Sequence, residues 1–287
     1  MIDMHIHAVP PQLPGVGSLN PCLRLPPEEV AKLIQDEMRS AGIQYVLSMG
    51  SLSSSIADPL GIQSTLRISS RVPGMFAIGI ANPEHNDAAF IRAAESQILE
   101  GKVVALKAYL GYLHYYPSDV GYHPYYKLAE KYHLPFIFHT GDTYSPEAKL
   151  KFAHPLGIDE VAVDFPNVSF VIAHVGNPWM LDAAEIVYKN LNVWADLSGL
   201  FIGDQKDFND PDWRCEAESI GKRLKEAFDY SARPNRFLYG SDWPLAPMNI
   251  YRQMIRQTIP ENFHEQIFFE NAQRLFFRNQ LSIKNPR

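Results

Sequence analysis

Short apolar stretches rich in Val, Ile, Phe and Tyr recur along the chain at intervals that suit a repeated unit of strand and helix. Eight of them have the length of a β-strand, and they cover residues 2–8, 45–50, 74–82, 103–111, 136–141, 169–176, 193–200 and 236–244. All are well short of the roughly 20 apolar residues that span a bilayer. The pattern therefore predicts eight buried strands and no membrane segment.

The segments between these stretches are patterned as helices. Residues 26–42 are the clearest case, with prolines and acidic residues at the start, apolar residues three and four positions apart, and Gly42 at the end. The same pattern is found at residues 85–101 and 122–135, and in the stretches after Trp179, before Phe237 and after Pro247.

Strands that alternate with helices indicate parallel βαβ units. Eight such units suit a closed (β/α)₈ TIM barrel. An open doubly wound sheet is the alternative, and the lack of a glycine-rich phosphate loop after the first strand argues against it. Because no linker or low-complexity segment divides the chain, we expect one domain over residues 1–287, with a frayed tail at residues 281–287.

Composition narrows the class of partner and the compartment. The chain has 287 residues, and its net charge of −6, without any Lys/Arg cluster, excludes the electrostatic footprint of a nucleic-acid-binding protein. Cys22 and Cys215 lie far apart in no metal-like spacing, and the first residues do not have the pattern of a signal peptide. We therefore expect a cytoplasmic protein that acts on a small molecule.

The first predicted strand contains two histidines separated by one residue, in the segment IDMHIHAVP at residues 2–10. Side chains at positions i and i+2 of a strand point to the same side. His5 and His7 should therefore project together, with Asp3 on that face. The other side chains of this strand are expected to face the helices: Ile2, Met4, Ile6 and Ala8. Alone, the pattern fits a polar surface strand as well as half of a metal site.

Three later strands end in residues of complementary chemistry: His139 in FIFHTG, His174 in FVIAHVG and Asp242 in YGSDWP. A barrel builds its active site at the carboxyl ends of several strands at once. Imidazoles and a carboxylate are good ligands for a borderline divalent ion such as Zn²⁺. Such an ion makes a bound water more acidic, and a carboxylate beside that water can take its proton.

The residues that precede these polar groups on the same predicted faces are apolar or small, as a barrel interior requires. They are Ile137 before His139, Phe170 and Ile172 before His174, and Leu238 and Gly240 before Asp242.

As a set, the motifs DMHIH, FHTGD, VIAHVGNPW and YGSDWP resemble the amidohydrolase superfamily over essentially the whole chain. The sequences of these motifs are similar to those of its amidohydrolase-related branch, which includes an aminocarboxymuconate semialdehyde decarboxylase, resorcylate-type decarboxylases and lactonases. The resemblance implies a TIM barrel of the metal-dependent hydrolase type. It also allows a homodimer.

The resemblance further implies that one divalent metal ion is bound by His5, His7, His139 and Asp242. It makes Asp242 both a ligand and the general base, and it places His174 beside the metal as a second-metal ligand or a polarising group. Zinc is the expected ion, with Mn, Fe or Co as alternatives.

Lys107, in VVALKAYLG, has three interpretations. By the resemblance, a carbamylated lysine on the fourth strand would bridge a second metal ion. Alternatively, its ammonium group pairs with an anionic substrate and assists catalysis. The third interpretation turns the side chain outward over the helices.

Aromatic and polar residues that follow the strand ends are candidates for binding a substrate, which we expect to be anionic or cyclic. These candidates are Lys107, Tyr109, Tyr112, His114, Tyr115, Trp179 and Trp243. Asp196 and Ser198 share one face of their strand, but the sequence does not say whether that face points inward.

The leading interpretation is a metal-dependent hydrolase that attacks an amide, lactone or ester carbon with metal-activated water. A lyase on the same site, either a non-oxidative decarboxylase or a hydratase, is the first alternative. His5 argues against the resorcylate type, which carries Glu at that position. A metal-independent lactonase and a non-catalytic binding barrel are the remaining alternatives.

Overall fold

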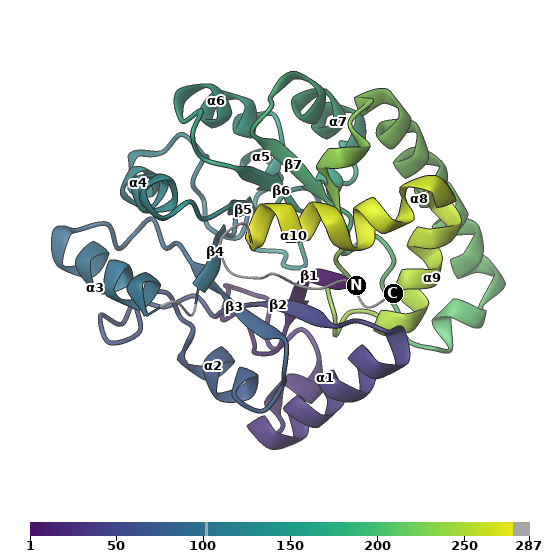
Figure 1. Cartoon of the computed structure of the whole chain (residues 1–287), viewed down its shortest axis with the longest axis horizontal. Coiled ribbons are helices and arrows are strands. Elements are labelled where there is room, and N and C mark those ends of the chain that lie inside the picture. Colours follow the sequence, from purple (N-terminus) through teal and green to yellow (C-terminus); the bar gives the residue numbers. More distant parts are fainter. Residues whose placement is uncertain (101–102, 278–287) are drawn as a thin grey trace.

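Eight parallel strands form a (β/α)₈ TIM barrel in the computed structural model of the chain, which describes residues 1–100 and 103–277 (Figure 1). Each strand pairs with its neighbours in chain order, as the sequence predicts. The strands are β1 (Ile2–His7), β2 (Tyr45–Met49), β3 (Met75–Ile80), β4 (Val103–Ala108), β5 (Phe136–Phe138), β6 (Phe170–Ile172), β7 (Val193–Asp196) and β8 (Phe237–Leu238). The expected frayed tail at residues 281–287 lies outside the described residues.

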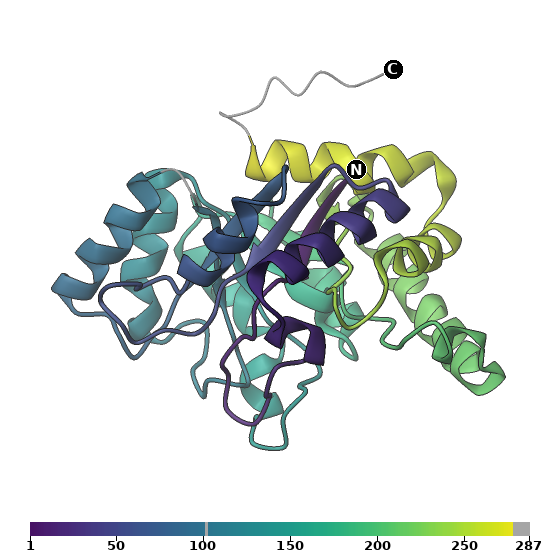
Figure 2. The ribbon, with the colours of Figure 1, turned by 90° about the horizontal axis from the view of Figure 1, so that it is seen from below.

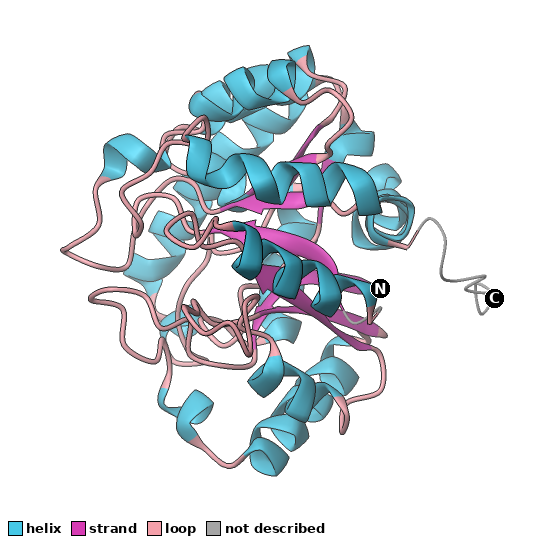
Figure 3. Cartoon of the chain, turned by 90° about the vertical axis from the view of Figure 1, so that its left-hand side faces the viewer, coloured by secondary structure: helices cyan, strands magenta, loops and turns pink. Residues whose placement is uncertain are grey.

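Helices cover the outside of the strands, and each helix that the sequence patterns predicted is present (Figure 3). The α-helices are α1 (Pro27–Ala41), α2 (Gln63–Ser69), α3 (Ala88–Leu99), α4 (His123–Tyr132), α5 (Leu150–Ala153), α6 (Gly157–Asp164), α7 (Met180–Lys189), α8 (Pro211–Ser231), α9 (Met248–Thr258) and α10 (Asn271–Phe276). The sequence patterns did not predict α2, α5 and α6. These three helices are short, so each contains too few apolar repeats to stand out.

The barrel closes between β1 and the loop that follows β8. The backbone N–H of His7 donates to the carbonyl of Trp243 at 2.7 Å, and the N–H of Asp242 donates to the carbonyl of His5 at 2.8 Å. Ile6 and Trp243 form a parallel bridge at the same place. Closure therefore joins the first and last strands at the residues that the sequence singles out for chemistry.

Two apolar layers stabilise the fold. One layer fills the barrel interior with a residue from every strand, and α10 covers the end of the barrel beside the N-terminus (Figure 2). The larger layer lies between the strands and the outer helices. The carboxyl ends of the strands carry the long loops on the opposite side (Figure 3).

The strict alternation expected in the first strand is wrong. The pairing of β1 with β2 shifts between Asp3 and Ile6, so β1 has one extra residue there. Ile2 and Met4 lie in the interior layer, whereas Ile6 packs outward as expected. A β-bulge allows Met4 and His5 to face the same side despite being neighbours.

Asp3 consequently does not join the histidines. Its Oδ1 atom accepts hydrogen bonds from the backbone N–H groups of His5 (3.2 Å) and Ser241 (3.0 Å). This carboxyl group therefore ties β1 to the loop after β8.

No helix within the described residues is long and apolar enough to cross a membrane. Cys22 and Cys215 are both free. The cytoplasmic location and the homodimer stay predictions.

We expect Asn271→Ala to destabilise the barrel by about 2 kcal/mol, because it removes the side-chain donor to one buried and one half-buried carbonyl group. The Asn271 amide, fully buried at the start of α10, donates to the carbonyls of Pro234 (2.9 Å) and Phe237 (2.7 Å). Urea unfolding measures the effect. The exposed Asn262 supplies the matched control, Asn262→Ala. Equal unfolding midpoints for the two variants would contradict this role of Asn271.

Candidate metal centre

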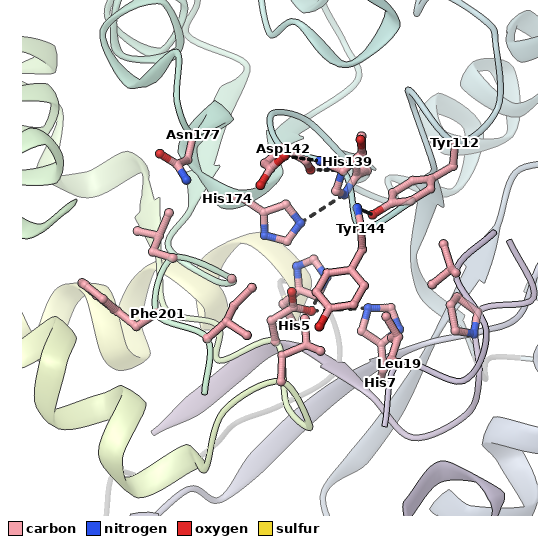
Figure 4. A pocket seen from close by; sticks show the side chains of 18 of the residues that line it. His5, His7, Leu19, Tyr112, His139, Asp142, Tyr144, His174, Asn177 and Phe201 are labelled. Atoms are coloured by element: carbon pink, nitrogen blue, oxygen red, sulfur yellow. Dashed lines mark hydrogen bonds and ion pairs between the residues drawn. The ribbon is translucent and has the colours of Figure 1, made fainter. Parts of the chain in front are cut away.

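Three buried side chains from the two ends of the chain form the only group of potential metal ligands found among the described residues: His5, His7 and Asp242. One ligand atom of each lies within 4.8 Å of the others. The Oδ1 atom of Asp242 is 3.5 Å from Nε2 of His5 and 3.4 Å from Nε2 of His7. The β1 bulge and the barrel closure bring these atoms together, and Figure 4 shows both imidazoles directed into one cavity.

Asp242 adopts an uncommon backbone conformation, with a φ of 60°. Asp tolerates this left-handed region better than most residues, and such conformations concentrate at functional sites. Gly199 lies against it, also left-handed, with a φ of 67°. A Cβ atom there would lie 2.5 Å from His174 Nδ1 and 2.9 Å from Asp242 Oδ2, so only glycine fits.

Asp196, at the end of β7, fixes the orientation and tautomer of His5. Its Oδ2 atom lies 2.5 Å from His5 Nδ1, and Ser198 Oγ is 3.0 Å from the same nitrogen. Burial alone would raise the pKa of Asp196, but the adjacent His5 imidazole brings it below its ordinary value, so the carboxylate stays ionised and accepts. Asp196 and Ser198 therefore both point into the barrel, a question that the sequence left open. A carboxylate that holds a ligating imidazole in this way is a common feature of metal sites.

The charges of these groups leave a place for a cation. Because His5 donates its Nδ1 proton to Asp196, its Nε2 presents a lone pair toward Asp242. Burial lowers the pKa of His5, which favours this neutral form. Asp242 Oδ1 and His7 Nδ1 have no hydrogen-bond partner in the described part of the chain. His5 Nε2 and Asp242 Oδ1 are thus two acceptors that face each other at 3.5 Å without a proton between them, and this arrangement fits a divalent metal ion.

His139 and His174 form a second pair beside this group. His139 Nδ1 lies 3.2 Å from His174 Nε2, and its Nε2 donates to the carbonyl of Asp142 at 3.0 Å (Figure 4). His174 Nδ1 is 3.0 Å from Ser198 Oγ. Burial lowers the pKa of His174 to about 4, and burial together with His174 holds the pKa of His139 well below its usual range. His139 is not part of the group of three, and its role as a ligand stays a prediction.

The expected layering of β6 is wrong. Phe170 and Ile172 pack against the helices, whereas Val171 and Ala173 belong to the interior layer. His174 still reaches the cavity because the chain leaves the strand in a 3₁₀ turn in which His174 has a φ of 58°. The turn resets the alternation.

Lys107 points into the cavity and not over the helices. Its side chain is fully buried, and its Nζ atom has no hydrogen-bond partner among the described residues. Burial lowers its pKa to about 8. The Tyr109 ring centroid lies 5.5 Å from Nζ, and the Tyr109 hydroxyl is also unpartnered in the part of the chain described.

A cavity of about 300 Å³ opens above the cluster. Of the candidate binding residues, Lys107, Tyr109 and Tyr112 line it. The hydroxyl of Tyr112 accepts a hydrogen bond from the backbone N–H of Tyr144 at 2.7 Å.

The other four candidates do not line this cavity. His114 donates to the carbonyl of Glu147 and stacks on Phe152. Tyr115 lies edge-on to Tyr122. Trp179 packs against His154, and Trp243 is buried in the outer layer, 4% exposed. Trp243 directly follows Asp242, whose side chain lines the cavity, but Trp243 itself packs in the outer layer.

Several lining residues were not expected from the sequence. They are Asp142, Thr143, Tyr144, Asn177, Gly199, Leu245, four residues of the segment after β1 (Pro11, Leu13, Val16 and Leu19), and a group on and before α8. Asp142, Thr143, Tyr144, Asn177 and Leu245 follow predicted strand ends, and Gly199 lies within the predicted stretch 193–200, which was the available signal. The residues of α8 carried no such signal.

A model of the amidohydrolase family matches residues 2–278. No curated protein sequence matches the chain.

Solved structures with the same architecture have diverse chemistry. A 2,6-dihydroxybenzoate decarboxylase from Rhizobium is 15% identical, with a TM-score of 0.64 over 96% of this chain and 98% of that one. A probable 2-pyrone-4,6-dicarboxylic acid hydrolase from Acinetobacter baumannii is 14% identical, with a TM-score of 0.63 and the same coverages. An amidohydrolase from Burkholderia multivorans, solved with bound zinc, is 13% identical, with a TM-score of 0.61 over 96% and 98%. At these identities the likeness shows the fold alone.

We expect Asp196→Asn to weaken metal binding by about 10- to 100-fold, because the amide accepts the His5 proton more weakly than the carboxylate does. Titration of the metal-free protein with Zn²⁺ measures the affinity. Asp182→Asn, an exposed change on α7, is the control. Wild-type affinity in the Asp196 variant would contradict the proposed role of this carboxylate.

The metal-free protein should become less stable as the pH falls from 6.5, the ordinary imidazole value, toward 4, the lowered pKa of His174. In this window the unfolded chain takes up a proton at His174 that the folded protein does not, so the free energy of unfolding falls with pH. Urea unfolding at several pH values measures the slope. His174→Gln should have a shallower slope, and an unchanged slope would refute this assignment.

Proposed function

The chain belongs to the amidohydrolase family, whose members are enzymes, and from this we propose that it is a metal-dependent hydrolase of a small molecule. The bond cleaved is an amide, lactone or ester. The substrate is anionic or cyclic and binds in the cavity above His5, His7 and Asp242.

One observation carries this proposal: the carboxylate oxygen of Asp242 faces two imidazole nitrogens at 3.4 and 3.5 Å, with no proton to share with His5. Such an arrangement is costly in a buried site unless a cation lies among the ligands. His5, His7 and Asp242 would hold the ion, and His139 is the predicted fourth ligand. When bound, the ion supplies a Lewis acid that polarises a carbonyl group and makes a coordinated water more acidic.

We assign the role of general base to Asp242 because its carboxylate lies beside both imidazoles and lines the cavity. Burial would raise its pKa, but the surrounding imidazoles, His5 first among them, hold it well below its ordinary value. The carboxylate is therefore ionised at neutral pH. It takes a proton from the water that adds to the carbonyl carbon and passes that proton to the leaving group.

His174 and Lys107 supply the remaining polar contacts. His174 is neutral at pH 7 because burial lowers its pKa, so it assists as a hydrogen-bond donor. The Lys107 ammonium group has no partner among the described residues and lies in the cavity, where it binds an anionic group of the substrate.

Zinc is the proposed ion, since imidazole and carboxylate ligands suit it, and the Burkholderia multivorans structure contains it. Mn, Fe or Co accept the same ligands. A second ion is proposed only if Lys107 is carbamylated.

A lyase is the second candidate. The unpartnered Lys107 ammonium group suits a substrate that carries a carboxylate, and the structural neighbour from Rhizobium is a decarboxylase. Decarboxylation would use the same ligands to hold the substrate and would release CO₂.

We expect Asp242→Asn and His139→Ala each to lower hydrolysis by about 100-fold or more, since each removes a ligand and the first also removes the base. The assay is a panel of lactones, amides and aryl esters, with CO₂ release from aromatic and unsaturated acids measured in parallel. Metal content should fall in both variants, while circular dichroism stays unchanged, because the barrel core lies below the site.

Asp164→Asn, on the exposed surface of α6, is the matched control. CO₂ release without hydrolysis would replace the hydrolase by the lyase. Full activity of both variants would show that the site is wrongly assigned.

A further inference from the structure

One apolar side of the cavity is built by α8 and by the loop that follows β7, and a second is built by Leu13, Val16 and Leu19 from the segment after β1. We call the first of these sides the α8 wall, and it consists of Leu200, Phe201, Ile202, Trp213, Ala217 and Ile220. The charged residue of α8 that also reaches the cavity is Glu216, whose side chain is exposed.

The stripe of α8 that forms the wall continues along the helix as a core stripe. Farther along, Leu224, Ala227 and Phe228 are at most 3% exposed against the rest of the protein. Trp213 and Ile220, by contrast, are only half-buried where the stripe lines the cavity. The protein therefore leaves part of an apolar stripe uncovered at this one place along α8, where a ligand can cover it.

Side-chain hydrogen bonds hold the wall in position. Trp213 Nε1 donates to the carbonyl of Ile202 at 2.9 Å, which ties α8 to the loop. The Tyr251 hydroxyl accepts from the backbone N–H of Leu200 at 3.0 Å and donates to the carbonyl of Leu197 at 2.5 Å. A preformed apolar surface costs little ordering on binding.

The α8 wall lies across the cavity from the ammonium group of Lys107, which is not one of the proposed metal ligands. Lys107 is on β4, whereas the wall follows β7, and strands three to four places apart in an eight-stranded barrel stand on opposite sides. Figure 4 shows Phe201 and Tyr112, which follow β7 and β4, on opposite sides of the histidines.

We infer that the α8 wall determines specificity, and that the substrate is an acid whose anionic group faces Lys107 while an apolar chain or ring covers Trp213, Ala217 and Ile220. The inference rests on the proposed function because it takes this cavity as the substrate site. It adds that the substrate has an apolar group at a distance from the reacting carbon. Ala217 sets how far the apolar group can extend, because a larger side chain there would fill the space.

The test measures binding and needs no turnover. Butanoate, hexanoate and octanoate are titrated into the metal-loaded protein by calorimetry. Burial of each methylene against the wall should tighten binding, and octanoate should bind about tenfold or more tighter than butanoate. Ile220→Asp should remove that difference while changing butanoate binding less than about twofold, because the charge would be added at the wall only.

Ser219→Asp introduces the same charge on the neighbouring exposed position and should bind all three acids as the wild type does. Ala217→Leu, which adds no charge, should weaken octanoate binding and spare butanoate. Undetectable octanoate binding, equal affinities for the three acids, or an Ile220→Asp variant that keeps the preference would each overturn the inference.

These outcomes are separate from those that test the hydrolase. Hydrolysis without a chain-length preference refutes the wall alone. A chain-length preference in a protein that hydrolyses nothing supports the wall and refutes the hydrolase alone.

Discussion

Two backbone hydrogen bonds that close the barrel also assemble the candidate metal centre. Asp242 donates its N–H to His5, and His7 donates its N–H to Trp243, so the last strand's loop is aligned on the first strand at the ligand positions. His5 and Asp242, which meet at the site, are separated by 237 positions in the sequence. Geometry at the site therefore depends on the whole barrel, and the ligands need no local motif to find one another.

Much of this was predictable from the residues. Strand-sized apolar runs predicted the barrel, and polar residues at the ends of these runs predicted where His5, His7 and Asp242 meet. The regular alternation fails at two places. A bulge in β1 turns Met4 inward beside His5, and a left-handed His174 resets the face after β6. Both departures depend on backbone conformations that a period of two does not encode. The α8 wall was not predictable because its position depends on how a long loop returns over the barrel.

Burial and charge divide the site into parts with distinct roles. Desolvation lowers the pKa of the buried imidazoles of His5, His139 and His174, and the pKa of the Asp196 and Asp242 carboxyl groups beside them is also lowered. Neutral imidazoles with ionised carboxylates are the protonation states that ligate a metal ion. Lys107 contributes an unpartnered cation from the opposite side, among the residues described, and the α8 wall contributes apolar surface. The amidohydrolase family thus supplies the scaffold, and this chain's own loops define the ligand that it can accept.

The central claim is that His5, His7 and Asp242 bind a divalent metal ion. Anomalous X-ray diffraction at the zinc edge, from crystals of the zinc-loaded protein, tests it most directly. The account predicts a peak at coordination distance, about 2.0–2.2 Å, from a nitrogen of each histidine and an oxygen of Asp242. A zinc peak that contacts none of these three residues, or no peak in crystals of fully active protein, would contradict it.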